Sequence, residues 1–283
     1  MTRRRHMTDW TFWALCGLGF VLIAAPSVSV LVAVIHQAWP SLSTDLFTKS
    51  TSGNGAGLQN AIFGTLLLLL GVLIVAGSVG VAAGIYLAEY ASGRSEHVLR
   101  FFSEVLAGMP SIVIGYIAYV TLVVQFHWGY SLAAAVLALS VLVMPYIVKT
   151  TEVALRQVPT TLREGAAGLG MPRSATLRTI LIPTALPGIM SGLIVALAIS
   201  TGELAPLLFT ANFTDSNPSL SLFHHSVPYL TGVVYNDLAQ PGQHYHSMSA
   251  AAGLISLIIL IVLIALGRVV SGRARRRTAR MSL

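Results

Sequence analysis

Long apolar runs without charge, separated by short charged segments, dominate this chain. Residues 12–35, 58–88 and 105–148 contain no Asp, Glu, Lys or Arg. A helix crosses a bilayer with about 20 apolar residues, so each of the first two runs fits one span. The third run is too long for one helix through a hydrocarbon core of about 30 Å, and we divide it at the turn-like QFHWGY, residues 125–130.

The pattern predicts an all-α, polytopic membrane protein with six transmembrane helices. Backbone groups inside a bilayer must be satisfied within their own segment, which favours helices, and the alternation of a membrane barrel is absent. The first run is longer than the roughly 7–15 apolar residues of a signal peptide, so we expect it to be retained. The expected spans are residues 12–35, 61–88, 105–124, 130–148, 186–209 and 249–267.

Composition and charge support this interpretation. Hydrophobic residues make up 55% of the chain and charged residues only 10%, whereas a soluble domain carries about 25% charged residues. The formal net charge is +7, and sixteen of the 17 Lys and Arg residues fall on the side of the N-terminus, with Lys49 alone opposite. The positive-inside rule therefore places both tails, 1–11 and 268–283, and the 149–182 segment in the cytoplasm, and 211–247 outside.

Two further features narrow the class of protein. The single cysteine, Cys16, can build neither a disulfide framework nor a thiolate metal site. The basic C-terminal tail is expected to contact anionic membrane lipid, at about 1 kcal/mol per charge near the surface. Because this tail lacks interleaved aromatic residues, nucleic-acid binding is the weaker interpretation, and we expect no nucleic-acid partner.

The 149–182 segment contains a compact pattern of small residues and arginines. Thr160 or Thr161 followed by Glu164 has the spacing of a capping box, and Gly170 followed by Met-Pro indicates a helix stop. A second short helix is expected from Arg173 to Ile180, ended by Pro183. Small residues allow close backbone approach, so this face suits docking on another protein, with Glu164 and the Arg residues, Arg163 among them, pairing around the rim. The alternative is an ordinary solvated loop whose arginines only set topology.

The spacing of this segment resembles the EAA loop of ATP-binding-cassette importer permeases. Glu164, Gly165 and Ala166 are followed after three residues by Gly170, and after nine more by Ile180-Leu-Ile-Pro183. The chain departs from the family pattern at Gly165, which replaces Ala at a cost of up to about 1 kcal/mol of helix stability, and at Ile182, which replaces Leu. The resemblance implies that this loop couples the membrane domain to a cytoplasmic ATPase.

Other stretches resemble the phosphate importer permeases of the Pst type. They are GIYLAEYA at 84–91, LAGMPSIVIGY at 106–116 and GELAPLLFTA at 202–211, the last being similar to the A-type subunit. The resemblance implies a type I importer permease fold, with one permease domain over 61–267, in the bacterial plasma membrane. It also implies a C-type permease partner, an ATPase dimer and an extracytoplasmic phosphate-binding protein, with inorganic phosphate as substrate.

The chain lacks the phosphate-binding loop of an ATPase. No G-x-x-x-x-G-K-[ST] pattern occurs, and neither Lys49 nor Lys149 follows such glycines. We therefore expect a non-catalytic subunit without a cofactor of its own, whose partner ATPase binds ATP and Mg²⁺.

Glu203 is the one carboxylate well inside an expected span. A charge in that position costs at least about 2.5–3.5 kcal/mol on insertion scales, so a functional role is the default hypothesis. Nearby residues that loosen the helix or offer hydroxyls to phosphate are Ser200, Thr201, Gly202 and Pro206. The alternative is a Glu bonded to a neighbouring helix or lying close to the outer surface.

Two further points concern the substrate path. Pst-type permeases commonly carry an Arg one turn before this Glu, where this chain has Ile199, so an Arg for the anion is expected from the partner permease. Pro110 and Ser111 open the third span, and Ser111 either faces the path or caps the helix.

The outer 211–247 segment is expected to contact the binding protein, because a loop of this length usually has a function. His244 and His246 have a metal-like spacing, but scattered solvated histidines are the simpler interpretation and no metal site is predicted. The open alternatives for the whole protein are an importer of another oxyanion such as sulfate, an ATP-independent transporter or channel using Glu203 as an ion site, and a subunit that only senses phosphate.

Overall fold

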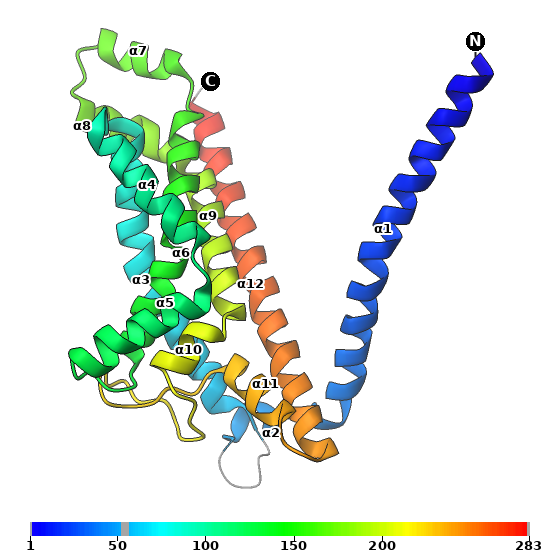
Figure 1. Ribbon diagram of the computed structural model, residues 1–283. Helices are drawn as coiled ribbons and strands as arrows, with labels where there is room; N and C mark the ends of the chain where they lie inside the picture. The colour runs from blue at the N-terminus through cyan, green and yellow to red at the C-terminus, as the bar shows by residue number, and fades with distance from the viewer. Residues whose placement is uncertain (1, 52–56, 282–283) are drawn as a thin grey trace.

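The computed structural model describes the backbone of residues 2–51 and 57–281, and the side chains of residues 10–51, 57–269 and 272. The described chain consists of helices and connecting loops, without strands. α7, α8 and the last turns of α12 lie at one end of the molecule, with the start of α1 at the same level, and α2 and α11 lie at the opposite end (Figure 1). The N-terminal helices are α1 (Thr2–Ala38), α2 (Asp45–Thr48) and α3 (Gln59–Glu89).

The remaining helices begin at Arg94. α4 (Arg94–Gly108) and α5 (Ser111–Ala118) lead into a π-helical turn over Tyr119–Gln125, and α6 (Leu132–Arg156) follows. The segment after α6 forms α7 (Thr160–Gly168), α8 (Arg173–Thr176) and a second π-helical turn over Leu177–Leu181. The chain ends with α9 (Ile182–Gly202), α10 (Ala205–Thr210), α11 (Leu230–Leu238) and α12 (Gln243–Met281).

Five described helices are long and apolar enough to cross a membrane. They cover Trp10–Ser41, Gln59–Glu89, Leu132–Arg156, Arg173–Gly202 and Gln243–Val269. A sixth span results if the bent pair Arg94–Gly108 and Ser111–Gln125 is counted as one. The all-α polytopic fold predicted from the sequence is therefore confirmed, whereas its position in a membrane stays a prediction.

The expected third span, 105–124, is not one straight helix. The chain bends by 103° between α4 and α5. Met109, which precedes Pro110, is extended (φ −79°, ψ 129°), because the proline ring disfavours helical geometry in the residue before it. The first residues of the expected span thus belong to α4 and the rest to α5 and its π-helical turn.

The expected fifth span, 186–209, is also broken, at Glu203 and Leu204. Glu203 has an extended ψ of 131°, and Pro206 stands at the start of α10. A continuous helix would bring the Pro206 ring against the carbonyl of Gly202 and leave that carbonyl without a donor, so the helix ends at Gly202.

Pro183 does not end a helix, contrary to the sequence-based expectation. Helical structure continues from Arg173 to Gly202. The turn before Pro183, Leu177–Leu181, is π-helical, which widens the backbone where the proline ring would otherwise collide with the preceding turn. Pro183 itself lies in the first turn of α9.

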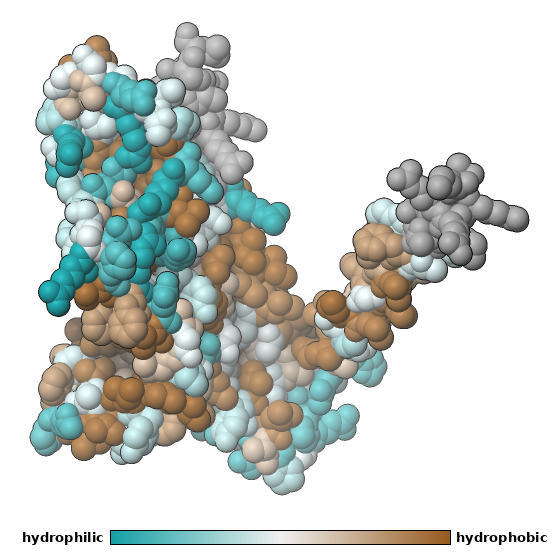
Figure 2. Space-filling model, turned by 45° about the horizontal axis from the view of Figure 1, so that its top comes forward, coloured by the Kyte–Doolittle hydropathy of each residue, from teal (hydrophilic) through white to brown (hydrophobic). Residues whose placement is uncertain are grey.

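The core lies between α3, α6 and α9. Its buried side chains include Leu68, Val72, Leu139, Ile147 and Leu197. A second cluster joins the end of α1 to α2, α3, α11 and α12, through residues such as Ala38, Leu46, Leu230 and Ala251. Most of α1 lies apart from this body, with its apolar side chains exposed (Figures 1 and 2). Hydrophilic residues gather at the end of the molecule that carries α7 and α8 (Figure 2).

The 211–247 segment is only partly a loop. Tyr229, Leu230 and Val233 are almost fully buried, and α11 packs against α12 and α3. A run of small and apolar residues thus adds a helix to the core where the sequence predicted an outer loop. Residues 212–228 are the non-helical part of that segment; 212–226 are exposed or half-buried, whereas Val227 and Pro228 are buried.

Gly64 of α3 lies where this segment packs against the helical body. A Cβ added at Gly64 would lie 1.9 Å from the Pro228 carbonyl oxygen, so one of the two backbones must move. We expect Gly64→Ala to destabilise the protein by about 1–3 kcal/mol, the usual cost of overpacking. The measurement is thermal unfolding of the detergent-purified protein.

Gly77 provides a matched control on the same helix. Its added Cβ would meet only side-chain atoms, of which Leu193 Cδ2 at 3.4 Å is the closest. Gly77→Ala should therefore leave the melting temperature unchanged or raise it. Equal melting temperatures for Gly64→Ala and Gly77→Ala would contradict this description of the contact.

Candidate functional site

α7 begins differently from the sequence-based expectation. Its N-cap residue is Pro159, which offers no side-chain acceptor, and no capping side-chain hydrogen bond forms. Thr160 and Thr161 already lie inside the helix, so the expected capping box with Glu164 is wrong. Proline is favoured at the start of a helix, and here Pro159 occupies the N-cap position in place of a residue with a hydroxyl group.

The end of α7 agrees with the expectation of a stop at Gly170. Gly170 has a φ of +69°, a left-handed conformation that glycine adopts without strain. The Gly170 N–H donates to the Ala167 carbonyl and the Met171 N–H to the Ala166 carbonyl, both at 3.0 Å. This pair of bonds is a Schellman motif, and it turns the chain sharply between α7 and α8.

Arg163 attaches α7 to the helical body. Its Nη1 donates to Glu89 Oε2 at the end of α3 (2.7 Å), and its Nη2 donates to the Leu155 carbonyl near the end of α6 (2.9 Å). Ala166 is also buried, at 3% exposure. A pocket of about 440 Å³ remains between the end of α3 and the α7–α8 turn, lined among others by Tyr90, Arg173 and Leu177.

The opposite face of α7 is open. Glu164, Gly165, Gly168 and Gly170 are exposed, and a Cβ added at any of the three glycines would meet no atom within 4 Å. We call residues 160–181 the coupling element. Its inner side is fixed by Arg163 and Ala166, and its outer side presents a small-residue surface that nothing in the described chain covers.

The coupling element connects directly to the Glu203 break. From Arg173 the helix continues as one rod to Gly202. Glu203 follows in extended geometry and is half-buried, and its backbone carbonyl accepts a hydrogen bond from Thr231 Oγ1 (3.1 Å). No ion pair with Glu203 occurs among the described side chains.

The hydroxyls next to this break are not free donors. Ser200 Oγ donates to the Ala196 carbonyl (2.9 Å), Thr201 Oγ1 donates to the Leu197 carbonyl (2.8 Å), and both side chains are buried. In this conformation both hydroxyl hydrogens are used within the helix, and the expectation that they bind a substrate stays a prediction. Gly202 is exposed, and a Cβ there would meet open space.

Two motifs that are distant in the sequence meet beside the break. A Cβ at Gly115 of α5 would lie 2.7 Å from Cα of Pro206, so the backbones of α5 and α10 are in close contact. The rings of Tyr116 and Phe209 lie edge to face, with centroids 6.0 Å apart. The structure thus brings the 106–116 and 202–211 stretches together.

Pro110 and Ser111 stand at the start of α5, about one helical turn before Gly115. Pro110 is exposed at the N-cap position, and Ser111 is half-buried in the first turn without a capping bond. The capping alternative for Ser111 is therefore wrong. Its role in a substrate path stays a prediction.

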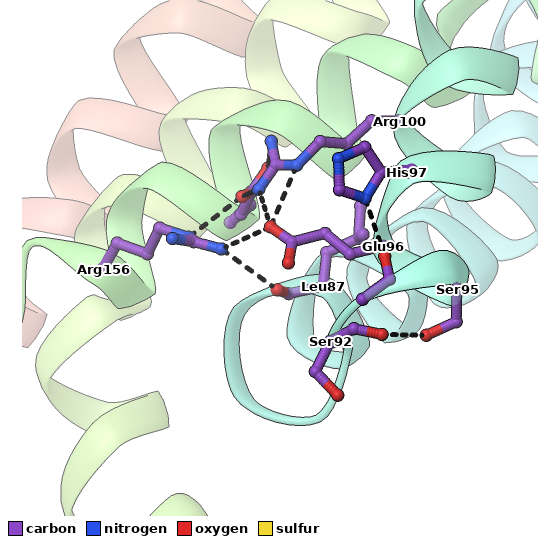
Figure 3. Close-up of polar contacts among 9 residues, drawn as sticks. Leu87, Ser92, Ser95, Glu96, His97, Arg100 and Arg156 are labelled. Atoms are coloured by element: carbon purple, nitrogen blue, oxygen red, sulfur yellow. Dashed lines mark hydrogen bonds and ion pairs between the residues drawn. The ribbon is translucent and has the colours of Figure 1, made fainter.

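The structure contains a cluster of four charged residues that was not predicted from the sequence. Arg100 and Arg156 converge on Glu96 and on Glu152, which is 3% exposed (Figure 3). The sequence predicts a cytoplasmic segment over 149–182, but α6 extends through Glu152 and Arg156. The available signal was the four-residue spacing of Glu96 and Arg100 and of Glu152 and Arg156.

The outer segment carries one perturbed carboxyl. Burial, and then the nearby Asp215 carboxylate, raise the pKa of Asp237 in α11 to about 6, while His244 opposes the shift. Asp237 therefore takes up a proton in mildly acidic solution. The described residues contain no group of three or more His, Cys, Asp or Glu arranged to hold a metal ion.

Sequence comparisons place the chain among transport proteins. The profile of a family described as "binding-protein-dependent transport system inner membrane component" matches residues 80–276. The "phosphate transport system permease protein PstA 2" of Mycobacterium bovis is 44% identical over 274 residues, which is 97% of this chain and 91% of the relative. The "phosphate transport system permease protein PstA" of Pasteurella multocida is 37% identical over 242 residues, 82% and 84% of the two chains.

Solved structures share the fold at low sequence identity. A chain of a bacterial alginate ABC transporter, solved with its pentasaccharide-bound periplasmic protein, matches 96% of this chain and 97% of its own length, with a TM-score of 0.69 and 13% identity. A chain of the inward-facing MetNI methionine ABC transporter matches 76% and 94%, with a TM-score of 0.62 and 17% identity.

Proposed function

Because the chain belongs to the family of binding-protein-dependent transport system inner membrane components, we propose that it is a permease subunit of an ATP-driven importer of inorganic phosphate. The 44% identity to a phosphate permease over nearly the whole chain carries this proposal. The fold is that of a multi-pass membrane permease, and the family implies partners that bind substrate and hydrolyse ATP. The permease itself supplies the path and the mechanical connection.

The proposed transporter contains three further kinds of subunit. A C-type permease subunit completes the path, two ATPase subunits bind ATP and Mg²⁺ on the cytoplasmic side, and a phosphate-binding protein delivers substrate outside. Both chain termini and the coupling element are cytoplasmic. The common level of α7, the last turns of α12 and the start of α1 supports this orientation (Figure 1).

The coupling element is the proposed contact for the ATPase. Its outer face is open and rich in small residues, while Arg163 holds its inner face to α3 and α6. A movement of the docked ATPase would act on the rod Arg173–Gly202, whose far end is the break at Glu203. Alternation between outward and inward access would thus begin at the coupling element.

Glu203 is the proposed substrate-path residue of this subunit. A carboxylate alone repels phosphate, so Glu203 acts either protonated, as a hydrogen-bond donor, or by orienting an Arg of the partner permease. The stretch 212–226, where Leu220 is 81% exposed, is the proposed contact for the binding protein. The buried face of α11, with Leu230 and Val233, is excluded from that contact surface because it belongs to the core.

Reconstitution tests the proposed function. The complex copurified with the tagged chain is placed in proteoliposomes, with ATP inside and the binding protein outside. We expect uptake of radiolabelled phosphate that requires both ATP and the binding protein. Uptake of sulfate in preference to phosphate would assign a different oxyanion, and uptake driven by a proton gradient without ATP would assign a secondary transporter.

A further inference from the structure

The cluster of Glu96, Arg100, Glu152 and Arg156 links two helices, α4 and α6, through shared carboxylates. Arg100 donates to Glu96 Oε1 from Nε (3.1 Å) and Nη2 (2.9 Å), and its Nη1 and Nη2 also donate to Glu152. Arg156 pairs with Glu152 Oε1 (2.9 Å) and Glu96 Oε1 (3.3 Å). Each carboxylate therefore binds both guanidinium groups, and we call this cluster the ionic clamp (Figure 3).

The clamp is the principal attachment of the start of α4. α4 has no buried residue, whereas Glu152 on α6 is 3% exposed. Next to the clamp, α4 and α6 enclose a pocket of about 280 Å³ lined by Arg100, Ser103 and Tyr146 among others. Apolar packing at this point is thus incomplete, and the ion pairs determine how α4 lies on α6. A buried carboxylate that lost both cations would be strongly unfavourable, so Glu152 keeps the four groups together.

The clamp shares its supports with the coupling element. Arg156 Nη2 donates to the Leu87 carbonyl (3.4 Å), two residues before Glu89, which holds Arg163 of α7. Arg163 also bonds the Leu155 carbonyl, the residue before Arg156. The ends of α3 and α6 therefore carry both groups of contacts, and a displacement of α7 acts on the same short stretches that anchor the clamp.

The far end of α4 leads to the Glu203 region. α4 ends at Gly108, the chain bends at Pro110, and α5 then packs on Pro206 through Gly115. Two connections thus join the coupling element to the break at Glu203. One is the rod Arg173–Gly202, and the other runs through the clamp, α4 and α5.

We propose that Glu96, Arg100, Glu152 and Arg156 are positioning residues that make α4 move with the coupling element, so that α5 and α10 shift together with α9 around Glu203. None of the four touches the proposed substrate path. Their role is to convert ATP hydrolysis into transport, and the inference rests on the proposed function of the chain as an importer permease.

The test measures phosphate imported per ATP hydrolysed in the reconstituted complex. The key variant is Arg100→Gln/Glu152→Gln, which removes one buried charge pair together and avoids leaving either charge unpaired. We expect this ratio to fall about 2- to 30-fold, the range by which coupling networks respond to mutation, with assembly and ATP hydrolysis retained. The effects of Arg100→Gln and Glu152→Gln on this ratio, measured separately, should not add up to the effect of the double variant, because the two side chains are in contact.

Two controls separate coupling from general effects. Glu104→Gln removes an exposed carboxylate from the same helix, and Asp45→Asn removes an exposed ion pair with Lys49 (2.7 Å) far from α7. Both should keep the wild-type ratio. If the double variant fails to assemble, Glu96→Gln takes its place, because it leaves Glu152 paired with both arginines.

The outcomes distinguish this inference from the proposed function. Wild-type complex that imports no phosphate with ATP would overturn the proposed function and the clamp inference with it. Wild-type complex that imports phosphate, beside a clamp variant with an unchanged ratio, would overturn the clamp inference alone. A lower melting temperature with an unchanged ratio would also overturn it, since the cluster would then only stabilise the fold.

Discussion

Gly165→Trp is expected to reduce ATP-driven phosphate uptake by roughly 30-fold or more, the effect of losing a central interface contact of about 2 kcal/mol. Gly165 is exposed and a Cβ there meets no atom within 4 Å, so the new side chain begins in open space. We therefore expect the loss to arise at the surface that an ATPase would cover. The measurements are uptake in proteoliposomes and the amount of ATPase that copurifies with the tagged chain.

Gly165→Ala is the matched control for this substitution. Alanine adds one methyl group and favours the helix by up to about 1 kcal/mol, and it is also the residue that the EAA pattern carries there. Uptake should therefore stay near the wild-type level. Full uptake and full ATPase recovery with Gly165→Trp would show that the outer face of α7 is not the docking surface.

Glu203→Gln is expected to reduce phosphate uptake about 10- to 100-fold, because a hydrogen bond to a charged group contributes about 1.5–3 kcal/mol. Glu203 is half-buried at the break between α9 and α10 and forms no ion pair with another described side chain. Glutamine keeps the size and removes the charge. The extended backbone and the Thr231 bond to the Glu203 carbonyl do not involve the carboxyl, so the fold should persist.

The control for this experiment is Glu104→Gln, which neutralises an exposed carboxylate on α4. Complex yield should be equal for both variants, and only Glu203→Gln should lose uptake. If Glu203→Gln transports phosphate at the wild-type rate, the residue has no part in the mechanism. If the complex no longer assembles, Glu203 is a structural residue at the break.

Hydropathy and charge were sufficient to predict the long helices, because the bilayer demands continuous apolar segments. α3 and α6 occupy the stretches expected of the second and fourth spans, although α6 continues to Arg156. The bends could not be predicted from hydropathy. Pro110 and Pro206 both lie at helix breaks, while Pro183 lies in a continuous helix after a π-helical turn, and the composition around the three prolines does not reveal this difference.

Ion pairs between helices could not be predicted from the sequence either. Glu152 and Arg156 read as part of a solvated loop, although Glu152 is among the most buried charged residues of the described chain. Its partner Arg100 is 52 residues away, and only the packing of α4 on α6 brings the two together. The burial of part of the outer segment could not be predicted for a similar reason, since Leu230 and Val233 are buried only because α3 and α12 lie beside them.

The central claim is that the α7–α8 element is a cytoplasmic docking site for an ATPase. Photo-cross-linking in intact cells tests it directly, with a photoreactive amino acid in place of Gly165, where an added Cβ meets no atom within 4 Å. We predict a covalent adduct between this chain and an ATP-binding subunit. Adducts with an extracytoplasmic protein, or with lipid alone, would contradict the account.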